Sequence, residues 1–145
     1  MILGFHHAGV ATPDMERLSR FYVDLFHGRV LGEFEWDDDA VAMSARLGLA
    51  KSAGRLMMLG FGGARLELFQ FDWPVIALPD VPPSVARPGF SHICFEVDDI
   101  RAEFTRLSDA GMTFHAQPMA MPAGGAFTYG RDPDGNVVEL LQAPG

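Results

Sequence analysis

Two histidines and two glutamates stand at matching places in the two halves of this chain. His7 begins an apolar stretch near the N-terminus and His92 begins a similar one, while Glu67 and Glu139 each lie in a later apolar stretch of the same half. Imidazole nitrogens and carboxylate oxygens form a mixed ligand set that suits a divalent cation such as Zn, Ni, Co, Mn or Fe. The pattern therefore predicts one divalent metal per chain.

The alternation of side chains along the predicted strands indicates whether these four side chains share a face of the sheets. Successive residues of a strand point to opposite sides, and the apolar neighbours of each His or Glu are expected to pack on a helix. All four are thus placed on the other face, where an unpaired carboxylate would be costly. Any one of them alone could be an ordinary polar residue on a solvated sheet. The same types at the same places of both halves favour a metal.

The first half is predicted to hold a strand, a helix and three strands: residues 5–11, 12–28, 30–36, 55–61 and 64–71. Thr12 is expected to be the N-cap of the helix and Gly28 its stop signal, and Gly62-Gly63 is expected to form a hairpin turn. For residues 37–54 the sequence leaves two alternatives, a short helix and a mobile flap. The acidic run from Asp37 to Asp39 within them is interpreted as a solvated turn.

The second half repeats this order, with a helix capped by Asp98-Asp99 and with 118–125 as a loop. Its predicted strands are 90–97, 112–116, 126–131 and 136–142. The repeat predicts an α+β protein of two tandem βαβββ modules. Residues 1–72 form the first module, the proline-rich 73–88 the linker, and 89–145 the second module.

Composition narrows the classes of partner. The 145 residues carry a formal net charge of −8 and no apolar run approaches the length of a membrane span. Nucleic acid and membranes are therefore not expected as partners. Cys94 is the only cysteine, which suits a reducing, cytoplasmic location. His6 is expected to be structural or solvent-facing, and His115 to lie at the surface.

The motifs resemble those of the vicinal oxygen chelate superfamily, which includes glyoxalase I, methylmalonyl-CoA epimerase, extradiol dioxygenases and bleomycin resistance proteins. The resemblance covers nearly the whole chain and rests on the segments 7–11, 91–99 and 132–140, with Phe21-Tyr22 and Glu67-Leu68. It implies that the modules form an open, mixed-strand barrel around a metal cleft. The ligand positions of the family fall on His7, Glu67, His92 and Glu139.

By this resemblance the protein is expected to be a metal-dependent lyase or isomerase of the glyoxalase/epimerase type. Such an enzyme abstracts a proton next to a metal-bound carbonyl and stabilises an enediolate, with Glu139 as the better candidate base and Glu67 as the second. An Fe(II) extradiol-type dioxygenase using His7, His92 and Glu139 is one alternative. A non-catalytic protein that binds a drug or metabolite is the other.

The resemblance also implies a small-molecule substrate and a homodimer. Phe69, Phe127 and Tyr129 are candidates for the wall of the substrate pocket, although core packing is the ordinary role of such aromatic residues. Cys94 shares the face of His92 and is expected to be a small packing residue rather than a nucleophile. The substrate itself stays open, since the sequence places no cluster of Arg or Lys for a glutathione or coenzyme A group.

Overall fold

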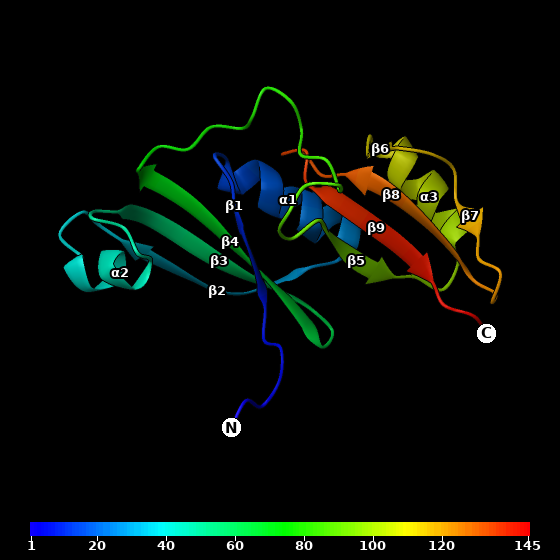
Figure 1. Ribbon diagram of the computed structural model, residues 1–145, viewed down its shortest axis with the longest axis horizontal. Helices are drawn as coiled ribbons and strands as arrows, with labels where there is room; N and C mark the ends of the chain where they lie inside the picture. Colours follow the sequence, from blue (N-terminus) through cyan, green and yellow to red (C-terminus); the bar gives the residue numbers. More distant parts are fainter. The chain divides into compact units, whose positions relative to one another are not determined.

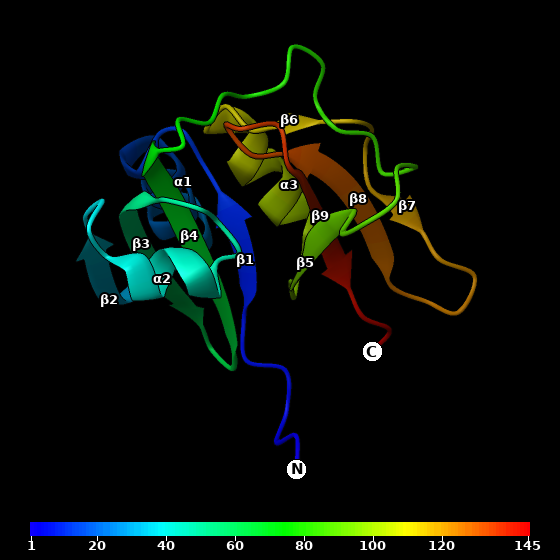
Figure 2. The ribbon, with the colours of Figure 1, turned by 60° about the vertical axis from the view of Figure 1, so that its left-hand side comes forward.

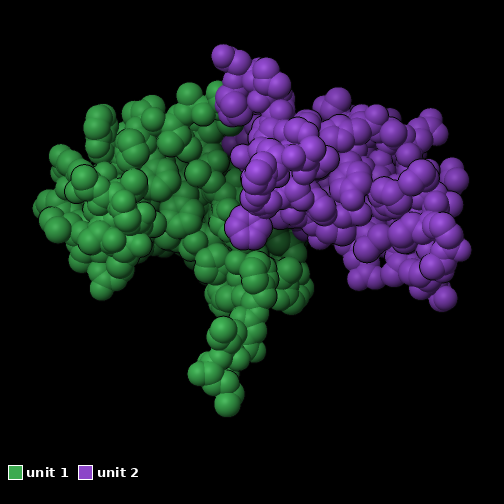
Figure 3. Space-filling view, in the orientation of Figure 1, with its two compact units in different colours: residues 1–78 green, residues 79–145 purple.

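The protein is described from a computed structural model that covers all residues, 1–145. It has an α+β fold with two mixed sheets, neither of which closes into a barrel (Figure 1). The chain divides into two compact units, Met1–Leu78 and Pro79–Gly145, coloured separately in Figure 3. The predicted pair of βαβββ modules is confirmed, and each unit is described below by itself.

The first unit is a four-stranded sheet with two helices. In chain order its elements are β1 (Ala8–Ala11), α1 (Met15–Phe26), β2 (Arg29–Trp36), α2 (Val41–Arg46), β3 (Ala53–Phe61) and β4 (Ala64–Trp73). The strands lie in the order β1-β4-β3-β2, and only the β1–β4 pair is parallel. The two helices lie on opposite faces of this sheet (Figure 2).

The second unit repeats this arrangement with a broken edge strand. Its elements are β5 (His92–Glu96), α3 (Ile100–Asp109), β6 (Thr113–Phe114), β7 (Met119–Ala120), β8 (Ala126–Arg131) and β9 (Val137–Gln142). The main path is β5-β9-β8-β6, and β7 also pairs with β8. The short strands β6 and β7 together stand where the continuous β2 stands in the first unit.

The same hydrogen bonds join strand to helix in both units. The Thr12 N–H donates to the Phe69 carbonyl, and the Val97 N–H donates to the Leu141 carbonyl, each at 2.8 Å. One residue further along the last strand, a glutamine side chain accepts a hydrogen bond from the first residue of the helix. This bond joins Met15 N to Gln70 Oε1 at 2.8 Å and Ile100 N to Gln142 Oε1 at 3.1 Å.

Burial follows the strand alternation that the sequence predicts. In β4, Leu66 and Leu68 are buried, whereas Glu67 between them is partly exposed. In β9, Val138 and Leu140 are buried around the partly exposed Glu139. The buried faces of α1 and α3 complete these cores with Met15, Leu18, Tyr22, Ile100 and Leu107.

Both ends of helix α1 differ from the predictions. Its N-cap is Asp14, whose carboxylate accepts from the Arg17 N–H, and not Thr12. Thr12 is still bound to β4 through its backbone, and its hydroxyl oxygen accepts from the Asp14 N–H. At the other end, His27 and not Gly28 takes the left-handed conformation, at φ 57°. Gly28 serves instead for packing, because a Cβ there would lie 2.7 Å from the Phe61 ring.

Of the two alternatives for residues 37–54 the short helix is present, and other boundaries differ from the predictions. The predicted strand 5–11 is only Ala8–Ala11, so His7 precedes the strand. Residues 37–54 contain the helix α2, which is fixed by hydrogen bonds of Ser44 to Ser52 and by the Trp36 indole to Ser52. The predicted strand 112–116 is only Thr113–Phe114, and beyond it the Ala116 carbonyl accepts a hydrogen bond from the Thr128 hydroxyl. The predicted loop 118–125 contains β7. None of the helices combines the length and the apolar character needed to cross a bilayer.

Candidate metal centre

The first unit brings His7 and Glu67 together on the sheet face opposite α1. Strand β1 runs parallel to β4 with Gly9 beside Glu67, so the residue two positions before Gly9 reaches the same carboxylate. His7 Nε2 lies 3.2 Å from Glu67 Oε2, and the Glu67 side chain is only 15% exposed. The other ring nitrogen, His7 Nδ1, lies 2.8 Å from Nδ1 of His6.

The second unit holds the equivalent pair in the equivalent register. Cys94 lies beside Glu139 in the parallel pair of β5 and β9, and His92 precedes Cys94 by two residues. His92 Nε2 lies 3.0 Å from Glu139 Oε2, with the glutamate side chain 14% exposed. The Ser91 hydroxyl lies 2.8 Å from His92 Nδ1. Each unit therefore holds one His–Glu pair, and in each pair Nδ1 of the histidine lies beside the side chain of the preceding residue.

Tyr129 and Cys94 surround the Glu139 carboxylate. Tyr129 lies directly across from Glu139 in the β8–β9 pair, and its ring contacts His92 edge-on at 5.3 Å between centroids. Desolvation first, and then the charge of Glu139 and a hydrogen bond to it, raise the pKa of the Tyr129 hydroxyl. Cys94 is an exposed residue, yet desolvation and then Glu139 raise the pKa of its thiol to about 11. Reactive cysteines have lowered pKa values, so Cys94 lacks the character of a nucleophile.

The first unit has no equivalent of these two neighbours. Gly9 stands in the place of Cys94, and Met58 lies across from Glu67 where Tyr129 lies across from Glu139. The candidate pocket residues are distributed over the two units. Phe127 contacts Tyr129 at 5.8 Å in the second unit, and Phe69 stacks on Phe71 at 5.9 Å in the first. Only the second unit therefore offers a hydroxyl group beside its glutamate.

The donor sets fit a divalent cation. In each unit an imidazole Nε2 and a carboxylate oxygen point to the same place, while Nδ1 is held by a neighbouring side chain, as is usual for histidines that bind metals. The structure brings the four predicted ligands together as two pairs and shows no cluster of three or more possible metal-binding side chains. The complete set of His7, Glu67, His92 and Glu139 stays a prediction.

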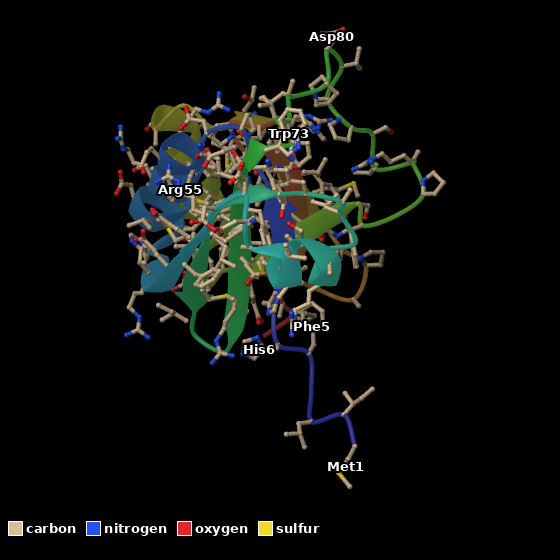
Figure 4. The ribbon with its side chains drawn as sticks, turned by 90° about the vertical axis from the view of Figure 1, so that its left-hand side faces the viewer. Met1, Phe5, His6, Arg55, Trp73 and Asp80 are labelled. Atoms are coloured by element: carbon tan, nitrogen blue, oxygen red, sulfur yellow. The ribbon has the colours of Figure 1, made fainter.

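A large hollow in the first unit is separate from the His7–Glu67 pair. Its volume is about 1030 Å³, and its lining includes Trp36, Asp38, Arg55 and Trp73 but neither His7 nor Glu67. Figure 4 shows His6 where the N-terminal segment meets the sheet, well separated from Arg55 and Trp73. The acidic run beside the hollow is exposed and forms a turn, in agreement with the sequence interpretation.

Sequence reasoning missed the partners of the two histidines. His6 is exposed, in agreement with the expectation that it is structural or solvent-facing, but its contact with His7 was not predicted, and Ser91 was given no role. The signal was available, because His6 and Ser91 each precede a predicted ligand and are separated by the same 85 positions as His7 and His92.

The chain is similar to an epimerase in sequence and to proteins of the glyoxalase family in structure. A methylmalonyl-CoA epimerase from Mus musculus, described as mitochondrial, is 27% identical over 150 residues, which cover 95% of this chain and 72% of that protein. A glyoxalase family protein from Bacillus cereus has a similar structure, with a TM-score of 0.87 at 17% identity over 100% of this chain and 97% of that one. A lactoylglutathione lyase from Agrobacterium tumefaciens gives a TM-score of 0.64 at 21% identity over 98% and 95%.

The family itself follows from the sequence profile that the chain matches. This match extends over residues 4–140, which is nearly the whole chain and includes both His–Glu pairs. The protein belongs to the Glyoxalase/Bleomycin resistance protein/Dioxygenase superfamily.

Proposed function

We propose that this protein is a metal-dependent lyase or isomerase of the glyoxalase/epimerase type. The observation that carries the proposal is the repeated pair of His Nε2 and Glu Oε2, at 3.2 Å in the first unit and 3.0 Å in the second. Two imidazoles and two carboxylates would together hold one divalent cation, of Zn, Ni, Co, Mn or Fe. The similarity to methylmalonyl-CoA epimerase and to a lactoylglutathione lyase supports this class of chemistry.

The reaction that we propose moves a proton between neighbouring carbons of a small molecule. The cation would supply Lewis-acid stabilisation of the charge that develops on a substrate carbonyl oxygen. Glu139 would accept the proton from the carbon beside this carbonyl and return it to the neighbouring carbon. This is general acid–base catalysis by a half-buried carboxylate. Glu67 is the second candidate for the same role.

The neighbours of Glu139 support its assignment as the base. The Tyr129 hydroxyl and the Cys94 thiol both lie close enough to Glu139 for its charge to raise their pKa values, so both are neutral donors at neutral pH. Hydrogen bonds from such donors orient a carboxylate without neutralising it. No equivalent pair of donors faces Glu67, where Gly9 and Met58 stand instead. Phe127 and Tyr129 would form part of the substrate wall.

Metal analysis tests the proposed ligand set. The purified protein is expected to contain about one divalent metal per chain, and a His92→Ala variant is expected to contain much less because it loses one of four donors. His27→Asn is the matched control, since His27 ends α1 and belongs to neither pair, and asparagine tolerates its left-handed backbone. Equal metal content in the wild type and in His92→Ala would remove His92 from the site.

Isotope exchange tests the reaction. In D₂O without oxygen, the wild type is expected to introduce deuterium at the carbon beside the carbonyl of an α-oxo or thioester substrate. Turnover that requires O₂ and shows no exchange would instead identify an extradiol-type dioxygenase using His7, His92 and Glu139. Tight binding of a compound without exchange or turnover across a broad panel would identify a non-catalytic binding protein.

Cytoplasmic location belongs to the same proposal. Cys94 is exposed and forms no disulfide, which suits a reducing compartment. Fractionation of cells that express the full-length protein, with detection by an antibody, would test this.

A further inference from the structure

We propose that His6 and Ser91 are positioning residues that hold Nδ1 of the neighbouring histidines, His7 and His92, and so keep Nε2 of each available to a cation. This inference rests on the metal site of the proposed function and goes beyond it, because it assigns a role to two residues that are not ligands. It depends only on contacts inside each unit.

The geometry is the same in both units although the residue types differ. The Ser91 hydroxyl lies 2.8 Å from His92 Nδ1, and His6 Nδ1 lies 2.8 Å from His7 Nδ1. On the far side of each ring, Nε2 faces a glutamate oxygen, at 3.0 Å for His92 and 3.2 Å for His7. Each ring is therefore fixed at both nitrogens, by the preceding residue on one side and by a strand neighbour on the other.

The chemistry of imidazole explains why such a partner is needed. A neutral histidine carries one ring proton, so the nitrogen that binds a cation must be the one without it. When Nε2 gives its lone pair to a cation, the proton is on Nδ1, and this N–H needs an acceptor. When Nε2 faces only a carboxylate, Nε2 carries the proton and Nδ1 needs a donor. A partner that serves Nδ1 in both states must therefore be able both to accept and to donate.

Serine and histidine are among the few side chains that meet this requirement. A serine hydroxyl changes from donor to acceptor when its hydrogen rotates, and neutral imidazole presents its Nδ1 as either donor or acceptor according to its tautomer. Lysine and arginine only donate, and an ionised carboxylate only accepts. The two different residues at the corresponding places, 6 and 91, thus share the one property that the neighbouring ligand needs.

Zinc titration by calorimetry on the full-length protein, first stripped with a chelator, tests this role. Ser91→Ala is expected to weaken zinc binding by about 10–100-fold, the usual effect of removing the group that orients a metal ligand. Ser91→Thr keeps the hydroxyl and is expected to bind as the wild type does. Ser84→Ala, which removes an exposed hydroxyl of the same unit, is the matched control. His6→Ala is expected to weaken binding similarly, with His27→Asn as its control, because His27 ends α1 and contacts neither pair.

Long-range ¹H–¹⁵N NMR of the zinc-loaded proteins separates positioning from a general loss of structure, because it reports which ring nitrogen carries the proton. In the wild type and in Ser91→Thr, the His92 Nδ1–H signal is expected to be protected from solvent exchange, and in Ser91→Ala this protection is expected to vanish. Weaker binding in Ser91→Ala that Ser91→Thr does not restore would contradict the positioning role.

The outcomes for the two proposals are distinct. A wild type that binds one zinc, together with Ser91→Ala and His6→Ala variants that bind it as tightly, would overturn the positioning role and leave the metal site intact. A wild type that binds no zinc would overturn both.

Discussion

At the scale of single residues, the two His–Glu pairs are similar but not equivalent. Both are held in parallel strand pairs and both have a partner on Nδ1. Only Glu139 also has a tyrosine directly across the sheet and a thiol beside it. This difference supports our proposal that Glu139 is the better candidate for the base and Glu67 the second.

This asymmetry leads to a prediction for Glu139→Gln. The amide keeps an oxygen donor of nearly the same shape but cannot accept a proton, so turnover is expected to fall by at least about 10²–10⁴, the usual contribution of a general base. The variant is expected to keep much of its metal, as measured by elemental analysis beside steady-state kinetics. Glu33→Gln, at an exposed position of β2, is the control. Unchanged turnover in Glu139→Gln would transfer the role of base to Glu67 or to another group.

At the scale of secondary structure elements, a glutamine near the end of β4 binds the start of α1, and a glutamine at the end of β9 binds the start of α3. Gln70 and Gln142 each accept a hydrogen bond from the first helical N–H, which has no partner within the helix. Just after β1 the Thr12 N–H donates to the Phe69 carbonyl, and just after β5 the Val97 N–H donates to the Leu141 carbonyl. Each acceptor directly precedes the glutamine in its strand. These contacts tie the start of each helix to the strand that carries the glutamate.

We therefore expect Gln142→Ala to destabilise the protein by about 1 kcal/mol, since it leaves the Ile100 N–H without its acceptor. Gln142→Glu keeps an acceptor near the positive end of α3 and is expected to cost less. Urea denaturation followed by circular dichroism measures both, and Gln117→Ala in an exposed segment is the reference. Equal stability of Gln142→Ala and the wild type would show that another group, such as water, satisfies the helix end.

At the scale of the whole molecule, metal binding and folding are expected to be coupled. The four proposed ligands come from β4, β5, β9 and the residue before β1, so a cation that they share would bind the folded chain and not the unfolded one. A ligand at a hundred times its dissociation constant stabilises the folded state by about 2.7 kcal/mol.

A chelator is therefore expected to lower the melting temperature of the metal-loaded wild type. The same chelator is expected to have little effect on His7→Ala, which should hold the metal poorly from the start. Differential scanning calorimetry, with metal content checked before and after, makes this measurement. A melting curve that does not change although the metal is removed would argue against a structurally coupled site.

We also expect the protein to be a homodimer. Each sheet ends in unpaired strand edges, and the outer strand β2 exposes Val30, Leu31 and Phe34. Exposed edges and apolar side chains of this kind are usually covered by a partner. Analytical ultracentrifugation at micromolar concentration checks this, and a single monomeric species there would refute it.

The sequence by itself determined the repeat and the faces of its strands. Alternation around Leu66 and Leu68, and around Val138 and Leu140, predicted which side of each sheet carries Glu67 and Glu139, because neighbouring residues of a strand must point to opposite sides. The Gly62-Gly63 turn and the Asp99 cap were also predictable, since both depend on local backbone geometry.

Only the tertiary structure decided the features that depend on partners distant in the sequence. Thr12 is a residue type that favours the N-cap, but its N–H is bound to Phe69 of β4 and its hydroxyl to the Asp14 N–H, and Asp14 caps the helix that begins at Met15. The strand predicted over 112–116 is only Thr113–Phe114, and the Ala116 carbonyl beyond it is bound by the hydroxyl of Thr128, a residue of β8. The contacts of His6 with His7 and of Ser91 with His92 lie between sequence neighbours, yet their meaning depends on the glutamate that a distant strand brings to the opposite side of each ring. Strand pairing over long sequence separations creates that second contact, and no local pattern specifies it.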